Sequence, residues 1–305
     1  MASALLNAPL AVAKSFSPGH ITGFYDRPQL QPHGALLAGS AGAGFSIERG
    51  IQTIVQVYEG RQKSYQVTIN GAKVHDAEVS SWVVQRYLKL VDKNLFISVD
   101  HEVGIPIGYG LGSSGAAALS LSYALNSALG TGMSKVQAAQ IAHVAEIECK
   151  TGLGTVIAEF VGGFETRLSI GGPGIGSITS KSLDGYKAVI LCMSPISTRK
   201  ALADISALNG IGSRMVQRLA QDGSPEEFMR LASAFATEIG LSKGRCREPM
   251  EAMARQGFLS SVALFGETVF SLVPKNEVSK AKAILGQFGG TLIVCNVDSD
   301  GAKLL

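Results

Sequence analysis

A glycine-rich segment, placed between a short apolar run and a run rich in Ala and Leu, constrains this chain more than any other feature. It reads Pro-Ile-Gly-Tyr-Gly-Leu-Gly-Ser-Ser-Gly-Ala-Ala-Ala over residues 106–118. Glycines in such a turn let successive backbone N–H groups converge at the start of a helix, where the helix dipole is positive. That arrangement binds phosphate groups. The segment therefore predicts a strand, a phosphate-binding loop and a helix, in that order.

Two well-known phosphate motifs differ from this segment. The P-loop pattern G-x-x-x-x-G-K-[ST] needs a lysine after its second glycine, and the segment has none. Gly110, Gly112 and Gly115 match G-x-G-x-x-G, but the dinucleotide fingerprint also needs an acidic residue about 20 positions later. Residues 133–139 contain no acidic residue. A simpler interpretation is a glycine turn in which Ser113 or Ser114 caps the following helix.

Length and composition predict two domains. The chain has 305 residues, of which 46% are hydrophobic, enough for a sizeable core. The glycine-rich stretch 170–176 is typical of a boundary, so we expect one domain over residues 1–180, with the loop, and another over 181–305. Strands and helices are interleaved along the chain, which indicates an α+β or α/β arrangement.

Charge and cysteine usage narrow the function classes. A net charge of +3, spread along the chain, gives no reason to expect nucleic acid as a partner but suits an anionic small molecule. The four cysteines form no C-x-x-C pair, which fits a reducing, cytoplasmic setting. No apolar run reaches about 18 residues, so we expect no membrane span. Residues 1–13 are apolar and end in Ala-Val-Ala, as a signal peptide does, but they lack a basic residue and Pro9 interrupts them. We interpret them as an extension or first strand.

Periodicity places the remaining elements. The pattern predicts a strand and then a turn over residues 14–23, and a hairpin turn at Asn70-Gly71. Ser134 is expected to begin a helix as its N-cap. The other expected strands cover residues 51–58, 64–69, 95–99, 186–193 and 290–296. The other expected helices cover residues 80–91, 155–161, 199–208, 213–222, 225–240, 246–256 and 276–288.

Two further clusters carry chemistry. His143 and Glu146 are three residues apart, so they share a helix face, and a carboxylate near a phosphate loop can take one position around magnesium. The alternative is a solvated helix with ordinary surface charges, which we favour for Glu148. Arg167 follows the turn Gly162-Gly163, and a guanidinium can bind a carboxylate with two parallel hydrogen bonds. Its alternative is a surface arginine paired with Glu165 or Asp184.

The loop pattern P-x-x-x-G-L-G-S-S resembles motif 2 of the GHMP kinases, a superfamily named for galactokinase, homoserine kinase, mevalonate kinase and phosphomevalonate kinase. Other segments are similar to one archaeal branch of that superfamily, the pantoate kinases. They are the segments at 17–24, 39–46, 114–116, 151–154 and 264–270. The resemblance extends from about Lys14 to Asn296.

The resemblance implies a two-domain α+β GHMP kinase fold with ATP bound between the domains. It places ATP on the motif 2 residues Pro106, Gly110, Leu111, Gly112, Ser113, Ser114 and Gly115, and Mg2+ on Ser114 and Glu146. Pantoate would contact Ser40, His143, Arg167 and His20, with Arg167 on its carboxylate. The implied product is 4-phosphopantoate, on the archaeal route to coenzyme A. A homodimer is a further expectation.

One position departs from the family. The turn usually reads Thr-Gly-Leu-Gly-Asp, and that Asp is the proposed base, whereas this chain has Thr155, which has no useful basicity. Phosphoryl transfer depends mainly on positioning and charge neutralisation, so the enzyme could be slowed rather than inactive. Alternatively, Glu159 supplies the carboxylate, or the chain is a mutated or degenerate nucleotide-binding paralogue. A kinase for another small alcohol, resembling homoserine or mevalonate, is the competing function.

Overall fold

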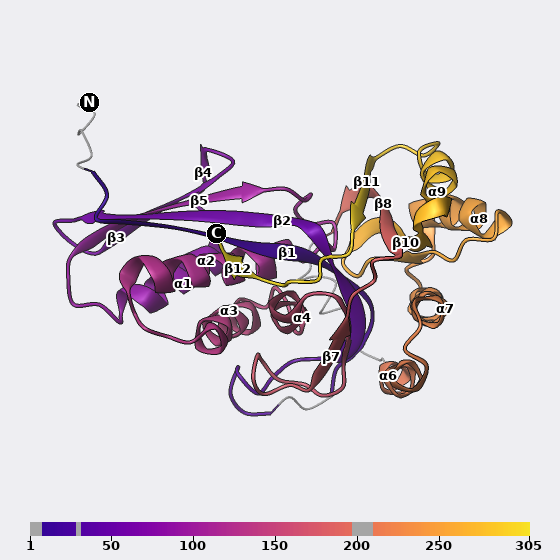
Figure 1. Ribbon diagram of the computed structural model, residues 1–305, viewed down its shortest axis with the longest axis horizontal. Coiled ribbons are helices and arrows are strands. Elements are labelled where there is room, and N and C mark those ends of the chain that lie inside the picture. The colour runs from indigo at the N-terminus through magenta and orange to yellow at the C-terminus, as the bar shows by residue number, and fades with distance from the viewer. Residues whose placement is uncertain (1–7, 29–31, 197–209) are drawn as a thin grey trace.

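The computed structural model describes residues 8–28, 32–196 and 210–305. Two long antiparallel strands, β1 (Ala11–Asp26) and β2 (Ala41–Glu59), run side by side along most of the molecule (Figure 1). They form the centre of an eight-stranded sheet with the order β12-β1-β2-β5-β3-β4, to which β6 and β7 are added beside β2. The other strands are β3 (Ser64–Ile69), β4 (Ala72–Lys73), β5 (Leu95–Val103), β6 (Phe164–Arg167), β7 (Ile178–Lys181) and β12 (Lys303–Leu304).

Four helices cover one face of this sheet, three of them in contact with its strands and α3 packed on the other three helices (Figure 1). They are α1 (Glu78–Leu88), α2 (Ser113–Leu129), α3 (Lys135–Cys149) and α4 (Thr155–Val161). Ser134 caps α3 through a complete capping box with Gln137, as predicted. The turn Asn70-Gly71 also forms as predicted, with both φ angles positive, and it joins β3 to β4.

The rest of the chain builds a second, four-stranded sheet with the order β11-β8-β10-β9. Its strands are β8 (Tyr186–Pro195), β9 (Ser261–Val262), β10 (Gly266–Pro274) and β11 (Thr291–Asn296). Its helices are α6 (Ile211–Asp222), α7 (Pro225–Glu238), α8 (Arg247–Arg255) and α9 (Val278–Leu285), with short 3-10 turns at Gly244–Cys246 and Lys275–Glu277. The helix expected at 199–208 lies outside the described residues.

One prediction about β1 is wrong. The turn expected after the strand within residues 14–23 does not form, because β1 continues through this whole stretch to Asp26. The register against β2 shifts between Pro18 and Gly19, which marks a bulge. A bulge tolerates proline because the ladder hydrogen bond that proline cannot donate is already missing there. A second shift follows between Thr22 and Phe24.

An aromatic cluster joins the two sheets. The ring centroid of Phe228 on α7 lies 5.2 Å from that of Phe164 and 6.0 Å from that of Phe45, both in the first sheet. It lies 6.5 Å from that of Phe270 in the second sheet. In addition, β12 returns from the second part to pair with β1. The two parts therefore share a core, and a boundary near residue 180 stays a prediction. Within the described residues, no helix is both long and apolar enough to cross a bilayer.

Candidate active site

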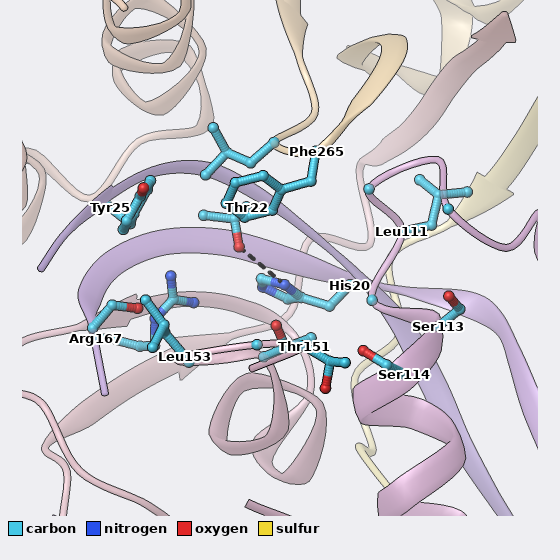
Figure 2. Close-up of a pocket in the computed structure, with 18 residues that line it drawn as sticks. His20, Thr22, Tyr25, Leu111, Ser113, Ser114, Thr151, Leu153, Arg167 and Phe265 are labelled. Atoms are coloured by element: carbon cyan, nitrogen blue, oxygen red, sulfur yellow. Dashed lines mark hydrogen bonds between the residues drawn. The ribbon is translucent and has the colours of Figure 1, made fainter. Parts of the chain in front are cut away.

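A pocket lies where the N-terminal end of α2, the bulged part of β1 and the turn before β10 meet (Figure 2). The phosphate loop contributes Gly108, Gly110, Leu111, Gly112, Ser113 and Ser114. The 151–155 turn contributes Thr151, Gly152, Leu153, Gly154 and Thr155, and β1 contributes His20, Thr22 and Tyr25. Ser40, Arg167, Leu264 and Phe265 complete the lining. The pocket therefore gathers most of the predicted site residues from segments far apart in the chain.

The loop has the geometry that its glycines predict. Gly108, Gly110 and Gly112 all have φ between +73° and +84°, a conformation that residues with a Cβ rarely adopt. Gly112 is the N-cap of α2, and no side chain caps this helix. The hydroxyls of Ser113 and Ser114 are thus not used for capping, which argues against the simpler interpretation. The first N–H groups of α2 have no partner within the helix, and they lie at the pocket. This end of α2 fits a phosphate group.

Ser114 leads to a buried carboxylate behind the pocket wall. Its Oγ donates a hydrogen bond to Oε1 of Glu146, at 2.5 Å, and Thr151 Oγ1 donates to the same oxygen at 3.0 Å. Glu146 is 2% exposed and does not itself line the pocket. Burial raises the pKa of Glu146, although both hydroxyls oppose this shift. A hydroxyl and a carboxylate, both hard oxygen donors, suit Mg2+.

Thr155 and Glu159 differ in their position relative to the pocket. Thr155 is the first residue of α4 and lines the pocket. Glu159 is fully buried beneath the loop, and neither of its carboxylate oxygens has a hydrogen-bond partner among the described residues. Burial, and then the charge of Glu146, raise the pKa of Glu159 well above its usual value. Glu159 is not among the pocket-lining residues.

A buried charge cluster forms the opposite wall. Glu165 on β6 pairs with NH1 of Arg167 and lies 3.0 Å from Nε2 of His20. Its second oxygen accepts a hydrogen bond from the backbone N–H of Gly44 at 2.5 Å. Nε of Arg167 has no hydrogen-bond partner among the described residues, although the side chain is only 1% exposed. Arg167 is therefore not a surface arginine: it pairs with Glu165, and its side chain lines the pocket.

His143 lies one step behind the pocket. Its Nε2 donates to the carbonyl of Ala38 at 3.0 Å, and burial lowers the pKa of its imidazole. Ser40, two residues after Ala38, lines the pocket, whereas His143 does not. Pro106 and Gly115 also lie outside the lining. His143 thus holds the segment that carries Ser40.

Apolar side chains close one side of the pocket. Phe265 has a φ of +66°, which is unusual for a bulky residue, and its ring centroid lies 6.4 Å from that of Tyr25. Burial raises the pKa of Tyr25 to about 12, so its phenol stays neutral. Sequence reasoning did not select Thr22 or Tyr25. Alternation from His20 points to Thr22, but the bulge after Thr22 makes Tyr25, rather than Phe24, the next residue at the pocket.

Comparison with known proteins identifies the class. The family model described as the GHMP kinases N terminal domain matches residues 80–163. A pantoate kinase of Thermococcus kodakarensis is 33% identical over 95% of this chain and 97% of its own length. A pantoate kinase of Methanocaldococcus jannaschii is 32% identical over 92% and 99%. A solved structure, titled a phosphotransferase related to the CoA biosynthesis pathway, is 30% identical, covers 96% of this chain and 98% of its own, and has a TM-score of 0.86.

The matched family model and the loop at the start of α2 define a GHMP kinase. Within that superfamily, the chain belongs to the pantoate kinase family.

Proposed function

We propose that this protein transfers the γ-phosphoryl group of ATP to the 4-hydroxyl of pantoate, giving 4-phosphopantoate for coenzyme A synthesis. One observation carries the proposal: a single pocket contains both the phosphate loop and the buried Arg167. The loop suits an anionic phosphate chain, and a guanidinium suits a carboxylate. Relatives that bear the name pantoate kinase are at least 30% identical to this chain over the aligned residues.

ATP would lie between the two parts of the molecule. The loop before α2 belongs to the first part, whereas Leu264 and Phe265 come from the turn that enters β10 in the second. At Gly110, a Cβ would crowd the Ala263 side chain at 3.2 Å, so the loop packs directly against this turn. Backbone N–H groups from Gly110 to Gly115 would hold the phosphates.

Ser114 and Glu146 would hold magnesium. Their side chains are already joined by a hydrogen bond at the phosphate end of the pocket. Mg2+ keeps several waters and commonly binds one or two carboxylates together with substrate phosphates, so two protein ligands are enough. When bound, the ion would neutralise negative charge that develops on the transferring group.

Arg167 and Ser40 would orient pantoate. The Nε of Arg167 is available, and a Cβ at Gly154 would lie 3.1 Å from it and 2.7 Å from the Ser40 hydroxyl. A carboxylate bound by Arg167 therefore places a neighbouring hydroxyl near Ser40. Pantoate also carries two methyl groups, which suit the apolar side formed by Leu153, Leu264 and Phe265. His143 would act through the Ala38 carbonyl rather than by direct contact.

The test is ADP release with pantoate, homoserine and mevalonate as acceptors. We expect release with pantoate and little with the other two. Gly112→Val should abolish it, since φ is +73° there and a side chain would crowd His20 and Thr155. Gly289→Val is the matched control, because a Cβ at this exposed glycine meets nothing within 4 Å.

A second candidate function rests on Thr155, which leaves the usual position of the base without a carboxylate. That change suits a nucleotide-binding protein without turnover. ATP binding in calorimetry, with no acceptor-dependent ADP release, would favour this candidate and contradict the kinase. Preferential release with homoserine or mevalonate would retain the kinase and replace its substrate.

A further inference from the structure

Three side chains form a hydrogen-bonded series that ends in the pocket. Oε1 of Glu165 lies 3.0 Å from Nε2 of His20, and Nδ1 of His20 lies 3.4 Å from the Thr22 hydroxyl. Glu165 comes from β6, and the other two residues come from β1. Figure 2 shows the Thr22 hydroxyl directed at His20, with His20 placed between Arg167 and the start of α2. Hydrogen bonds thus link a carboxylate to an imidazole and the imidazole to a hydroxyl.

The proton positions follow from the partners. An ionised carboxylate only accepts hydrogen bonds, so Nε2 of His20 carries the hydrogen and donates it to Glu165. In the neutral imidazole, Nδ1 then has a lone pair, which accepts from the Thr22 hydroxyl. Burial lowers the pKa of His20, which favours this neutral form. His20 is therefore ready to accept a proton from the pocket side.

His20 also lies next to the phosphate loop. Its backbone N–H donates to the carbonyl of Leu111 at 3.0 Å. On its other side, Glu165 joins it to Arg167. An acceptor whose carboxylate is on Arg167 and whose hydroxyl faces the loop must therefore pass beside Thr22 and His20.

The described pocket lining offers few other proton acceptors. Its titratable side chains are His20, Tyr25 and Arg167. The pKa of Tyr25 is raised to about 12 by burial, and an arginine does not lose its proton in proteins. Glu146 and Glu159 are close by, but neither lines the pocket.

We propose that Thr22 and His20 accept the proton of the acceptor hydroxyl and that Glu165 positions His20 for this step. The proposal rests on the proposed kinase function. As the acceptor oxygen bonds to the γ-phosphorus of ATP, the bond from that phosphorus to its bridging oxygen breaks and ADP leaves with the electron pair. The acceptor proton moves to Thr22 Oγ1 while the Thr22 proton moves to Nδ1 of His20. The imidazolium is stabilised by Glu165 and later returns its proton to water.

The same cluster couples this step to the substrate. The charge of Arg167 lowers the pKa of His20, whereas Glu165 raises it. A substrate carboxylate on Arg167 offsets the guanidinium charge, so His20 becomes a stronger base when the substrate is bound. The other ionisable groups near His20 are Tyr25 on β1 and, beneath Gly112, Glu159 on α4. Burial raises the pKa of Tyr25 to about 12 and raises that of Glu159 well above its usual value, which disfavours the charged form of each.

Thr22→Val removes the hydroxyl at nearly constant volume, and Thr22→Ser keeps it. We expect Thr22→Val to lower kcat by about 100- to 10,000-fold, the range for general acid–base catalysis, with the KM for ATP unchanged. Thr22→Ser should retain most of the rate, which excludes a folding defect as the cause. Thr179→Val on the exposed strand β7 is the matched control.

His20→Gln tests the base itself. Wild-type kcat should fall at low pH as His20 becomes protonated, below its ordinary pKa of 6.5, and the variant should lose this dependence. His75→Gln, at an exposed histidine, is the control and should keep it. A second readout needs no turnover: the His20 imidazole is titrated by NMR, and pantoate should raise its pKa.

Two results would overturn proton transfer through Thr22 and His20. One is a Thr22→Val enzyme with full kcat, and the other is a His20 pKa that pantoate does not change. They are distinct from failure of the proposed function, in which the wild type itself releases no ADP with pantoate. That last result would rule out both the kinase function and proton transfer through Thr22 and His20.

Discussion

Glu165 and Glu159 are both fully buried behind the lining of the same pocket, Glu165 next to His20 and Arg167 and Glu159 beneath Gly112. Glu165 is surrounded by donors: Arg167, His20 and the backbone N–H of Gly44. Glu159 has no hydrogen-bond partner among the described residues, and its strongest electrostatic neighbour is another carboxylate, Glu146. The two side chains are of the same type and equally buried, but the groups that surround them differ.

This difference gives the two carboxylates opposite electrostatic surroundings. A buried carboxylate stays ionised only when donors and cations compensate for lost hydration, as they do at Glu165. Without them the acid is retained, which is why the pKa of Glu159 is raised well above its usual value. Glu165, paired with Arg167, can support an imidazolium at His20, whereas the raised pKa of Glu159 disfavours the charged form that a base needs. The distance of a carboxylate from the phosphate loop therefore does not show whether it acts in catalysis.

Removing the cation beside Glu165 should produce the largest effect. Arg167→Met leaves a buried carboxylate with only part of its compensation, and breaking such a pair costs about 3–5 kcal/mol of unfolding free energy. Denaturant unfolding measures this loss. Arg247→Met is the matched control: its exposed pair with Glu251, one helical turn away, contributes little because solvent screens it. Equal losses in the two variants would show that Glu165 does not depend on Arg167. Adding Glu165→Gln to Arg167→Met should recover part of the stability.

The next effect concerns Ser114 and Glu146. Each of Ser114→Ala and Glu146→Gln should lower turnover by about 10- to 100-fold at subsaturating magnesium, the scale for groups that support a metal site. Because the two side chains share one hydrogen bond, the double variant should lose less than the product of the single losses. Turnover across a magnesium series measures this coupling. Losses that multiply would mean that the residues act on separate steps.

Glu159 should respond to pH in the opposite way from a paired carboxylate. Its folded-state pKa is raised, so the folded protein holds a proton that the unfolded chain releases above about pH 4.5. Wild-type stability should therefore fall, relative to Glu159→Gln, by up to about 1.4 kcal/mol per pH unit between that pH and the folded-state pKa. Below pH 4.5 the difference should be constant. Paired unfolding curves from pH 4 to 8 measure it, and turnover at pH 7 should be unchanged. A variant that loses turnover would instead make Glu159 a working base.

The sequence predicted local structure correctly where a short run of neighbouring residues determines it. The loop before α2, the Ser134 capping box and the Asn70-Gly71 turn each depend on neighbouring residues, and each is confirmed. A curated relative and a similar solved structure also agree with motif 2. The turn expected within residues 14–23 is wrong because β1 continues through them, with a bulge that accommodates Pro18. That bulge is set by pairing with β2, which local propensity does not describe.

The charge cluster could be predicted only in part. Arg167 was selected from its Gly-Gly turn, with pairing to Glu165 as the alternative, and the structure combines the two: Arg167 pairs with Glu165 and lines the pocket. The link from Glu165 to His20 spans 145 residues and depends on β1 and β6 both flanking β2. The missing partner of Glu159 is likewise a property of packing. Hydrogen-bond partners across a sheet have no signature in a single sequence.

We expect the smallest effect from a substitution that adds a carboxylate at the pocket, close to Glu159. Thr155→Asp introduces at the start of α4 the acidic residue that the family resemblance leads us to expect there, and an acidic first-turn residue stabilises a helix by about 0.3–1 kcal/mol. Its carboxylate would enter the pocket beside Gly112, close to Glu159, and would raise the pKa of Glu159 further because both groups are negative when ionised. If Thr22 and His20 already accept the proton, a second base adds little, since a loose transition state depends weakly on one. We therefore expect kcat to change by less than about threefold, well short of the hundredfold typical of a restored base. Single-turnover rates of wild type, Thr155→Asp and Thr155→Asn decide this, since Asn matches Asp in shape without its charge. A hundredfold rise with Asp alone would mean that the base is missing in this chain, and it would assign Glu165 and His20 to binding rather than to proton transfer.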